Sequence, residues 1–190
     1  MKKAIIDLDD VLSLDAFLNM LNYFNNSNYK YSDINSYYVE EILPKERLIE
    51  YKDFFIKNNV YDFAIVASNS KEVLKNLMLE YEIYITSSYY SYLHNDIIPE
   101  LIPRKCEFLK KNYPFLSAKN FIFTNDKLML EADLRIDDRI DNLGKNGINI
   151  LYKAYHNENI EEKELENKNI LRVKDWDDIE EKVLKKSIYK

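Results

Sequence analysis

The sequence predicts an α/β protein: a three-layer, Rossmann-like parallel sheet with a small helical cap inserted after the first strand. Short apolar runs alternate along the chain with segments of helical periodicity, a pattern typical of parallel strands joined by right-handed crossovers. The first apolar run ends in a cluster of aspartates within the first ten residues. A helical block of roughly 45 residues then precedes the next clear strand, which is more than one crossover requires.

The first strand is the apolar run Ala4–Ile6, which leads directly to Asp7, Asp9 and Asp10. A short β-branched run bounded by acids is typical of a buried parallel strand, and ligand sites of parallel sheets lie at the carboxyl ends of the strands. Carboxylates packed this closely repel one another unless a cation lies among them, and Mg²⁺ suits oxygen ligands. The alternative is a solvated, Asp-rich turn after an edge strand.

Two helices are expected in the cap. Apolar residues recur at helical spacing from a helix start near Ser13 as far as Phe24, and Pro44 is well placed to begin a second helix that runs to about Asn58. Residues 14–60 contain no strong strand. We therefore expect a cap of residues 14–60 and a core domain of residues 1–13 and 61–190.

The rest of the chain alternates between strands and helices. Asn69 with Glu72 resembles a capping box at the start of a helix. The elements expected after it are a strand at Glu82–Thr86, a helix at Arg104–Lys111 and strands at Asn120–Thr124, Leu134–Ile136, Ile148–Tyr152 and Ile170–Val173. The last helix is expected to begin after Asp175, with Asp178 at the third position of the cap.

Composition narrows the class of protein. The chain has 190 residues, long enough for one well-packed domain, and a net charge of −6, which argues against binding the backbone of a nucleic acid polymer. Two glycines are too few for a P-loop or a dinucleotide-binding fingerprint. Cys106 is the only cysteine, so no internal disulfide can form, and no apolar segment approaches membrane-spanning length. These features indicate a cytoplasmic protein with no membrane partner, and a homodimer is compatible with them.

Three further features directly follow predicted strands. Thr86 and Ser87 offer hydroxyl groups that can donate to phosphate oxygens, Lys127 can neutralise phosphate charge, and Asp137 and Asp138 end an alternating apolar strand. Taken singly, each has an ordinary explanation: a polar loop, a surface lysine and a helix N-cap. Their order along the chain is more specific than any one of them.

This order resembles the four motifs of the haloacid dehalogenase superfamily of phosphohydrolases. Within it, Ile6–Leu12, the step Ile85–Ser87, and Lys127 followed by Asp133–Arg139 look most like the 5'(3')-deoxyribonucleotidases. The resemblance spans about residues 4–143 and includes the place of the cap. It implies a haloacid dehalogenase-like core and a Mg²⁺-dependent phosphomonoesterase that hydrolyses nucleoside monophosphates.

The resemblance also implies roles for single residues. Asp7 would be the nucleophile that forms an aspartyl-phosphate, and Asp9 the acid that protonates the leaving oxygen and then activates water. Thr86 and Ser87 would bind phosphate oxygens. Lys127 would hold both the phosphate and the nucleophile.

The implied metal ligands are Asp7, the backbone carbonyl of Asp9, and the pair Asp137 and Asp138, of which Asp138 is preferred as the direct ligand. The implied partner is a small phosphorylated substrate. The cap is rich in aromatic residues that can stack on a nucleobase or pack in a core, namely Phe17, Tyr23, Phe24, Tyr37, Tyr38, Phe54 and Phe55.

Three alternatives differ from a nucleotidase. The same chemistry could serve a sugar phosphate or another small phosphomonoester, and a non-catalytic protein could bind phosphate on the same fold. A phospho-receiver module also uses acids, a hydroxyl and a lysine around Mg²⁺. In a receiver the acceptor aspartate ends a central strand, but the nearest candidate, Asp62, precedes the apolar run 63–67.

Overall fold

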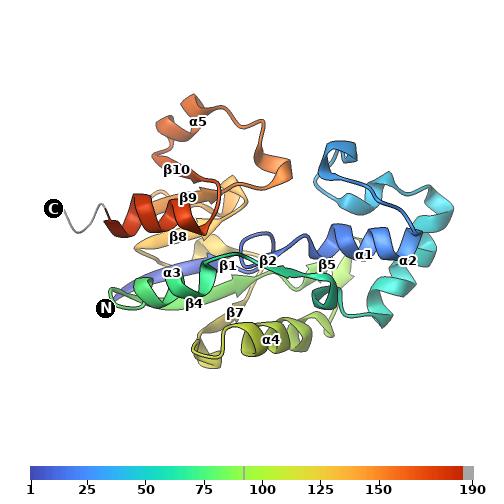
Figure 1. Ribbon diagram of the computed structural model, residues 1–190, viewed down its shortest axis with the longest axis horizontal. Helices are drawn as coiled ribbons and strands as arrows, with labels where there is room; N and C mark the ends of the chain where they lie inside the picture. Colours follow the sequence, from blue (N-terminus) through green and yellow to red (C-terminus); the bar gives the residue numbers. More distant parts are fainter. Residues whose placement is uncertain (92, 186–190) are drawn as a thin grey trace.

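The computed structural model describes residues 1–91 and 93–185, and a parallel sheet forms the centre of this part of the chain. The strand order is β10-β9-β8-β1-β4-β7, and every neighbouring pair is parallel (Figure 1). The strands are β1 (Lys2–Asp7), β4 (Tyr81–Ser87), β7 (Phe121–Phe123), β8 (Leu134–Asp137), β9 (Ile148–Tyr152) and β10 (Ile170–Val173). The predicted α/β, Rossmann-like fold is confirmed.

Helices connect the strands. They are α1 (Ala16–Asn25), α2 (Lys45–Lys57), α3 (Ser70–Leu77), α4 (Leu101–Asn112), α5 (Glu162–Asn167) and α6 (Trp176–Ile179). Shorter 3₁₀ turns cover Tyr31–Asp33, Val39–Ile42, Val60–Phe63, Ala118–Asn120, Lys127–Met129, Ile140–Asn142 and Tyr155–Asn157, and a π-helical segment, Glu180–Lys185, follows α6. Among the described residues, no helix has the length and apolar composition needed to cross a membrane.

β1 lies in the interior of the sheet because its side chains are apolar on both faces. Ala4 and Ile6 are fully buried on one face and Ile5 is buried on the other, and the strand pairs with β4 along its whole length and with β8 at Ala4–Ile6. Trp176 of α6 is also fully buried, and its indole N–H donates to the carbonyl of Val11 at 2.9 Å. These contacts fix the turn that follows β1, where the aspartates lie.

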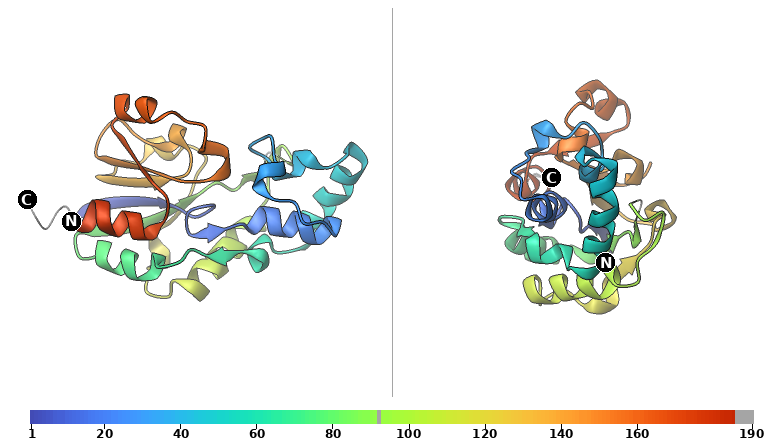
Figure 2. Two further views of the ribbon diagram at one scale, coloured as in Figure 1. Left: turned by 45° about the horizontal axis from the view of Figure 1, so that its top comes forward. Right: turned by 90° about the vertical axis from the view of Figure 1, so that its right-hand side faces the viewer.

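Helices α1 and α2 lie beyond one end of the sheet, away from α3 and α6 (Figures 1 and 2). A two-stranded antiparallel ribbon, β2 (Ser13–Leu14) with β3 (Ile65–Val66), carries the chain out to them and back. A second small ribbon joins β5 (Tyr90–Ser91) to β6 (Asp96–Ile97). The chain therefore passes between the sheet and the outer helices twice, once through β2 and once through β3.

Aromatic contacts also attach the outer segment to the loops of the sheet. The rings of Tyr31 and Tyr155 stack with centroids 4.4 Å apart, and the Tyr155 hydroxyl donates to the carbonyl of Tyr37. The Arg139 guanidinium lies 5.0 Å from the centre of the Tyr37 ring. The segment after α1 is therefore held against the loops that follow β8 and β9.

Two local predictions were wrong. Ser13 does not begin a helix, because its backbone is extended in β2 and α1 starts only at Ala16. Asn69 is the N-cap residue of α3, as predicted, but the predicted capping box does not form: its φ is 58°, and its side-chain amide donates to Asp177 at 2.6 Å. Between α1 and α2 the chain forms loops and 3₁₀ turns rather than continuous helix.

Other local predictions were right. Pro44 is the N-cap position of α2, and the Asp175 side chain accepts a hydrogen bond from the backbone of Asp178 at 2.9 Å. The strands at Ile148–Tyr152 and Ile170–Val173 have the predicted bounds. Helix caps and strand bounds that depend on residues close together in the sequence were therefore predicted correctly.

Candidate active site

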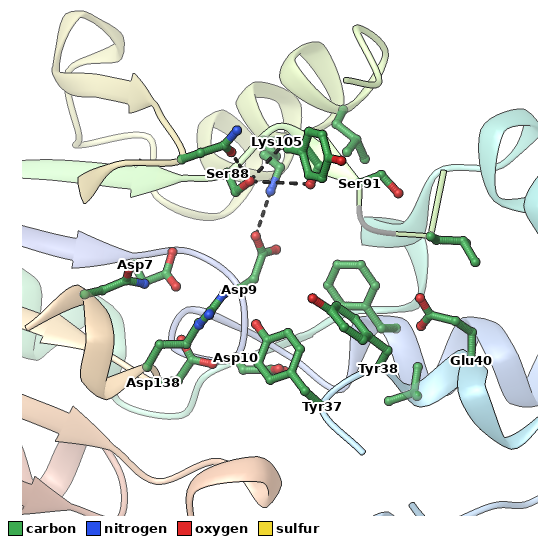
Figure 3. A pocket seen from close by; sticks show the side chains of 18 of the residues that line it. Asp7, Asp9, Asp10, Tyr37, Tyr38, Glu40, Ser88, Ser91, Lys105 and Asp138 are labelled. Carbon is green, nitrogen blue, oxygen red and sulfur yellow. Dashed lines mark hydrogen bonds and ion pairs between the residues drawn. The ribbon is translucent and has the colours of Figure 1, made fainter. Parts of the chain in front are cut away.

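The carboxyl ends of three neighbouring strands bring the predicted acids and hydroxyls together. β1 lies between β4 and β8, and Asp7 pairs in register with Thr86 of β4. Asp137 ends β8 on the other side of β1. Because parallel strands end at one edge of the sheet, residues from distant parts of the sequence meet beside one cavity (Figure 3).

This cavity has a volume of about 180 Å³ and opens between the sheet edge and residues 14–60. Its acidic end includes Asp7, Asp9, Asp10 and Asp138. The aromatic residues that line it are Phe17, Tyr31, Tyr37, Tyr38, Tyr51, Phe55, Tyr90 and Tyr155. Four of the predicted cap aromatics are in this set, whereas Tyr23, Phe24 and Phe54 contact one another instead.

Lys127 bridges two of the buried acids. Its Nζ lies 2.7 Å from Oδ1 of Asp7 and 2.8 Å from Oδ2 of Asp137. The same Oδ1 of Asp7 accepts the backbone N–H of Leu8 at 2.7 Å. Burial raises the pKa of Asp7 well above its usual range, and the carboxylates of Asp137 and Asp138 add to this against the opposing Lys127. Lys127 and the N–H of Leu8 therefore fix the direction of the Asp7 carboxylate, but the single charge of Lys127 does not offset its burial and the neighbouring carboxylates.

Asp9 lies in a separate set of contacts. The ammonium of Lys105 and the hydroxyl of Ser87 each lie 2.7 Å from its Oδ2, and the hydroxyl of Tyr61 donates to its Oδ1 at 2.7 Å. Burial opposes ionisation of Asp9, but Lys105 and the hydroxyl donors outweigh it and lower the pKa of this carboxyl. The two acids of the first motif thus have different surroundings, since each has its own lysine.

Asp137 and Asp138 also differ. Beside Lys127, Asp137 accepts from the backbone N–H of Arg139 at 3.0 Å and from the Asn142 amide at 2.9 Å. Asp138 lines the cavity, while Asp137 does not. Protein donors already occupy both oxygens of Asp137, so of the pair Asp138 is the better placed for a ligand.

His156 contacts Asp138 from the loop after β9, with Nε2 2.6 Å from the carboxylate. Burial and the nearby Arg139 lower the pKa of His156 to about 4, and burial and Asp137 raise the pKa of Asp138. Both shifts disfavour the charged form of the group concerned, so the contact is described as a hydrogen bond.

The predicted phosphate-binding hydroxyls lie at the carboxyl end of β4. Thr86 is fully buried, with its Oγ1 3.4 Å from the carbonyl of Ile6, and Ser87 donates to Asp9. The residue of this run that lines the cavity is Ser88. The strand therefore brings Thr86 and Ser87 beside the acids without exposing their side chains to the cavity.

Among the described residues, four acids and one histidine form two groups of three that could hold a metal ion. Ligand atoms of Asp7, Asp137 and Asp138 lie within 4.8 Å of one another, and the same holds for Asp10, Asp138 and His156. Three buried carboxyl groups, those of Asp7, Asp137 and Asp138, lie beside the single ammonium of Lys127, and their burial and mutual repulsion raise the pKa of Asp7 and Asp138. This donor set, rich in carboxylate oxygens, fits a divalent cation.

The sequence did not reveal Lys105, Tyr61 or His156 as site residues. Lys105 lies on the buried face of α4, Tyr61 in the 3₁₀ turn that leads back from the outer helices, and His156 in the loop after β9. The one available signal was a lysine at a position of apolar spacing, between Leu101 and Phe108. A helix residue reaches the sheet edge only when the crossover packs there, which periodicity does not specify.

Replacing Asp10 by Asn is expected to stabilise the metal-free protein. Burial and the carboxylates of Asp9, Asp15 and Asp7 raise the pKa of Asp10 to about 8. Asp10 then stays protonated in the folded chain, whereas in the unfolded chain it ionises above about pH 4. Its cost to folding grows from about pH 4 to about pH 8 and is constant above that. The full shift would correspond to roughly 5 kcal/mol, but Asp10 is only half-buried, so thermal unfolding in EDTA at about pH 8 should show a gain of about 2 kcal/mol for Asp10→Asn.

Asp15→Asn is the matched control for backbone conformation, and it should give a smaller gain, because it removes only one of the charges that raise the pKa of Asp10. Asp10 and Asp15 both have a positive φ, 55° and 59°, a conformation that Asn tolerates well. If both variants gained the same stability at every pH, backbone conformation rather than buried charge would explain the gain.

Comparison with known proteins adds an independent line of evidence. Residues 3–188 match the family described as "5' nucleotidase, deoxy (Pyrimidine), cytosolic type C protein". The chain is 30% identical over 189 residues to a 5'(3')-deoxyribonucleotidase of Bacillus subtilis (strain 168), covering 97% of this chain and 100% of that protein. The 5'(3')-deoxyribonucleotidase of Bacillus phage SPbeta matches to the same extent. A crystal structure of a hydrolase from Pseudomonas syringae superposes with a TM-score of 0.49 at 13% identity, over 97% of this chain and 98% of that one.

Proposed function

Since this chain belongs to the cytosolic type C family of deoxy-pyrimidine 5'-nucleotidases and is a phosphomonoester hydrolase, we propose that it is a Mg²⁺-dependent 5'(3')-deoxyribonucleotidase. The observation that carries this proposal is the position of Asp7. It ends the central strand, lies 2.7 Å from Lys127 and lines a cavity with an acidic and an aromatic end. Such a cavity suits a phosphate attached to an apolar, planar group.

In the proposed reaction an oxygen of Asp7 attacks phosphorus and the bond to the ester oxygen breaks, which yields an aspartyl phosphate. Because its pKa is lowered in the free site, Asp9 has to take up a proton when the phosphate binds, and it gives that proton to the ester oxygen as the nucleoside leaves. The ionised Asp9 then takes a proton from a water molecule, whose oxygen attacks phosphorus. This second step releases inorganic phosphate and restores Asp7.

The other predicted site residues contribute charge and position. Lys127 would hold the phosphate beside Asp7, and Thr86 and Ser87 would bind phosphate oxygens at the end of β4. Mg²⁺ bound by Asp7, the backbone carbonyl of Asp9 and Asp138 would offset the charge of the carboxylates and the phosphate. In this arrangement Asp137 keeps Lys127 in place and contacts the metal site only indirectly.

The outer segment would act as the cap. We assign residues 14–60 to it and residues 1–13 and 61–190 to the catalytic core. Aromatic side chains of the cap line the cavity opposite the acids, where a nucleobase can stack on them. A closed cap would also exclude water from the phosphate while the nucleophile attacks.

The proposal is tested by measuring inorganic phosphate release from a panel of substrates. The panel contains ribo- and deoxyribonucleoside 5'- and 3'-monophosphates and several sugar phosphates, each with Mg²⁺ or EDTA. We expect release from deoxynucleotides that EDTA abolishes. Release confined to sugar phosphates would keep the mechanism and reject the substrate, and no release from any substrate would reject the proposal.

A further inference from the structure

A second buried lysine, Lys105, lies at the site and contacts Asp9 rather than Asp7 (Figure 3). Its side chain comes from α4, is 2% exposed, and places Nζ 2.7 Å from Oδ2 of Asp9 and 2.5 Å from Oγ of Ser87. Removing an ammonium group from water is costly unless an opposite charge compensates for it. Among the described residues, Asp9 is the carboxylate that forms an ion pair with Lys105.

Tyr61 holds the same carboxylate from the other side. Its hydroxyl donates to Oδ1 of Asp9 at 2.7 Å, and its ring lies 5.6 Å from the Lys105 ammonium. With the Ser87 hydroxyl on Oδ2, both oxygens of Asp9 have protein donors. A short side chain with donors on both oxygens has little freedom to rotate, so its direction is set by α4 and by the turn Val60–Phe63.

We propose that Lys105 and Tyr61 are positioning residues that hold the Asp9 carboxyl in line with the leaving ester oxygen. This inference rests on the proposed function, in which Asp9 transfers one proton to that oxygen while the phosphorus–oxygen bond breaks and Asp7 bonds to phosphorus. Lys105 lines the cavity and Tyr61 does not, but both have the Asp9 carboxylate as a partner, and in this proposal both act through Asp9. Lys105 also binds Asp9 apart from the carboxylates around Lys127, which keeps the acid separate from the nucleophile.

The leaving group distinguishes this role from simple phosphate binding. A nucleoside alkoxide needs a proton to leave, whereas p-nitrophenolate is stable without one. Loss of a well-placed acid should therefore slow the first substrate far more than the second. Loss of a phosphate-binding lysine would slow both equally, because the two substrates carry the same phosphate.

The experiment measures release of the leaving group in a single turnover, with enzyme in excess, so that the later hydrolysis of the aspartyl phosphate does not contribute. The substrates are a deoxynucleoside 5'-monophosphate and p-nitrophenyl phosphate. For Lys105→Met we expect about a 100-fold slower release of nucleoside and less than about a fivefold slower release of p-nitrophenol. Tyr61→Phe should show the same selectivity with a smaller loss, and Lys105→Arg should recover part of the nucleoside rate.

Lys110→Met is the matched control, since Lys110 lies on the same helix but is exposed, and it should leave both rates unchanged. Equal losses for both substrates, or no loss for either, would overturn the positioning role. If Lys105→Met does not fold, Tyr61→Phe still decides, because it removes one hydroxyl and keeps the ring. If the wild-type enzyme releases no nucleoside, the proposed function fails, and this result is distinct from either outcome of the variants.

Discussion

Asp7→Asn is expected to lower the rate of phosphate release by about 10⁴-fold or more, because an amide oxygen does not form the acyl-phosphate bond that the proposed mechanism requires. The fold should survive the change. Asn has nearly the same shape, and its oxygen can still accept the N–H of Leu8 and the Lys127 ammonium. In EDTA the variant should even unfold at a higher temperature than the wild type, since burial raises the pKa of Asp7 and makes its negative charge costly.

The measurement combines phosphate release with thermal unfolding of the same samples. Asp53→Asn is the control, because Asp53 is an exposed acid on α2 and should leave both quantities unchanged. An Asp7→Asn variant that is folded and keeps more than about one tenth of the wild-type rate would exclude Asp7 as the nucleophile.

Lys127→Met is expected to reduce the free energy of unfolding by about 3 kcal/mol in EDTA, because it leaves two buried carboxylates without their shared cation. Lys127 contacts Asp7 and Asp137, and both acids are buried. These two carboxylates raise the pKa of Lys127, although burial opposes the shift. Mg²⁺ should recover part of the lost stability, because a bound cation restores positive charge beside Asp7.

Denaturant unfolding of three variants checks this expectation. The double variant Lys127→Met with Asp137→Asn should recover a substantial part of the loss, because it removes one unpaired charge. Lys119→Met changes an exposed lysine and should stay within about 0.5 kcal/mol of the wild type. If Lys127→Met were as mild as Lys119→Met, the buried ion pairs would contribute nothing measurable to folding.

Local sequence was sufficient for most strands of the sheet. β9 and β10 have the predicted bounds because each is a short apolar run bounded by polar residues, and such a run has few other ways to bury its side chains. The N-cap hydrogen bond predicted at Asp175 also formed, because it joins two residues only three positions apart in the sequence. Ser13 and Asn69 were misjudged because distant partners decided their conformation: Ser13 pairs with Val66, and Asn69 donates to Asp177.

The site residues also fall into two groups, those that the sequence predicted and those that it did not. Asp7, Ser87 and Asp137 were found because each ends a strand, and the edge of a parallel sheet brings strand ends together whatever their separation in sequence. Lys105 and Tyr61 were missed because a crossover helix and a turn carry them to the site. Their pattern in the sequence is that of ordinary core positions.

By itself, the sequence determined the α/β class, the order of the strands along the chain and the acids, hydroxyls and lysine that follow them. These properties depend on local burial and on the rule that parallel strands end at one edge. The tertiary structure alone decided how the charges are divided, with Lys127 between Asp7 and Asp137, Lys105 on Asp9, and His156 on Asp138. Such pairings depend on distances of less than 3 Å between side chains from separate elements, and only the packing of those elements fixes such distances.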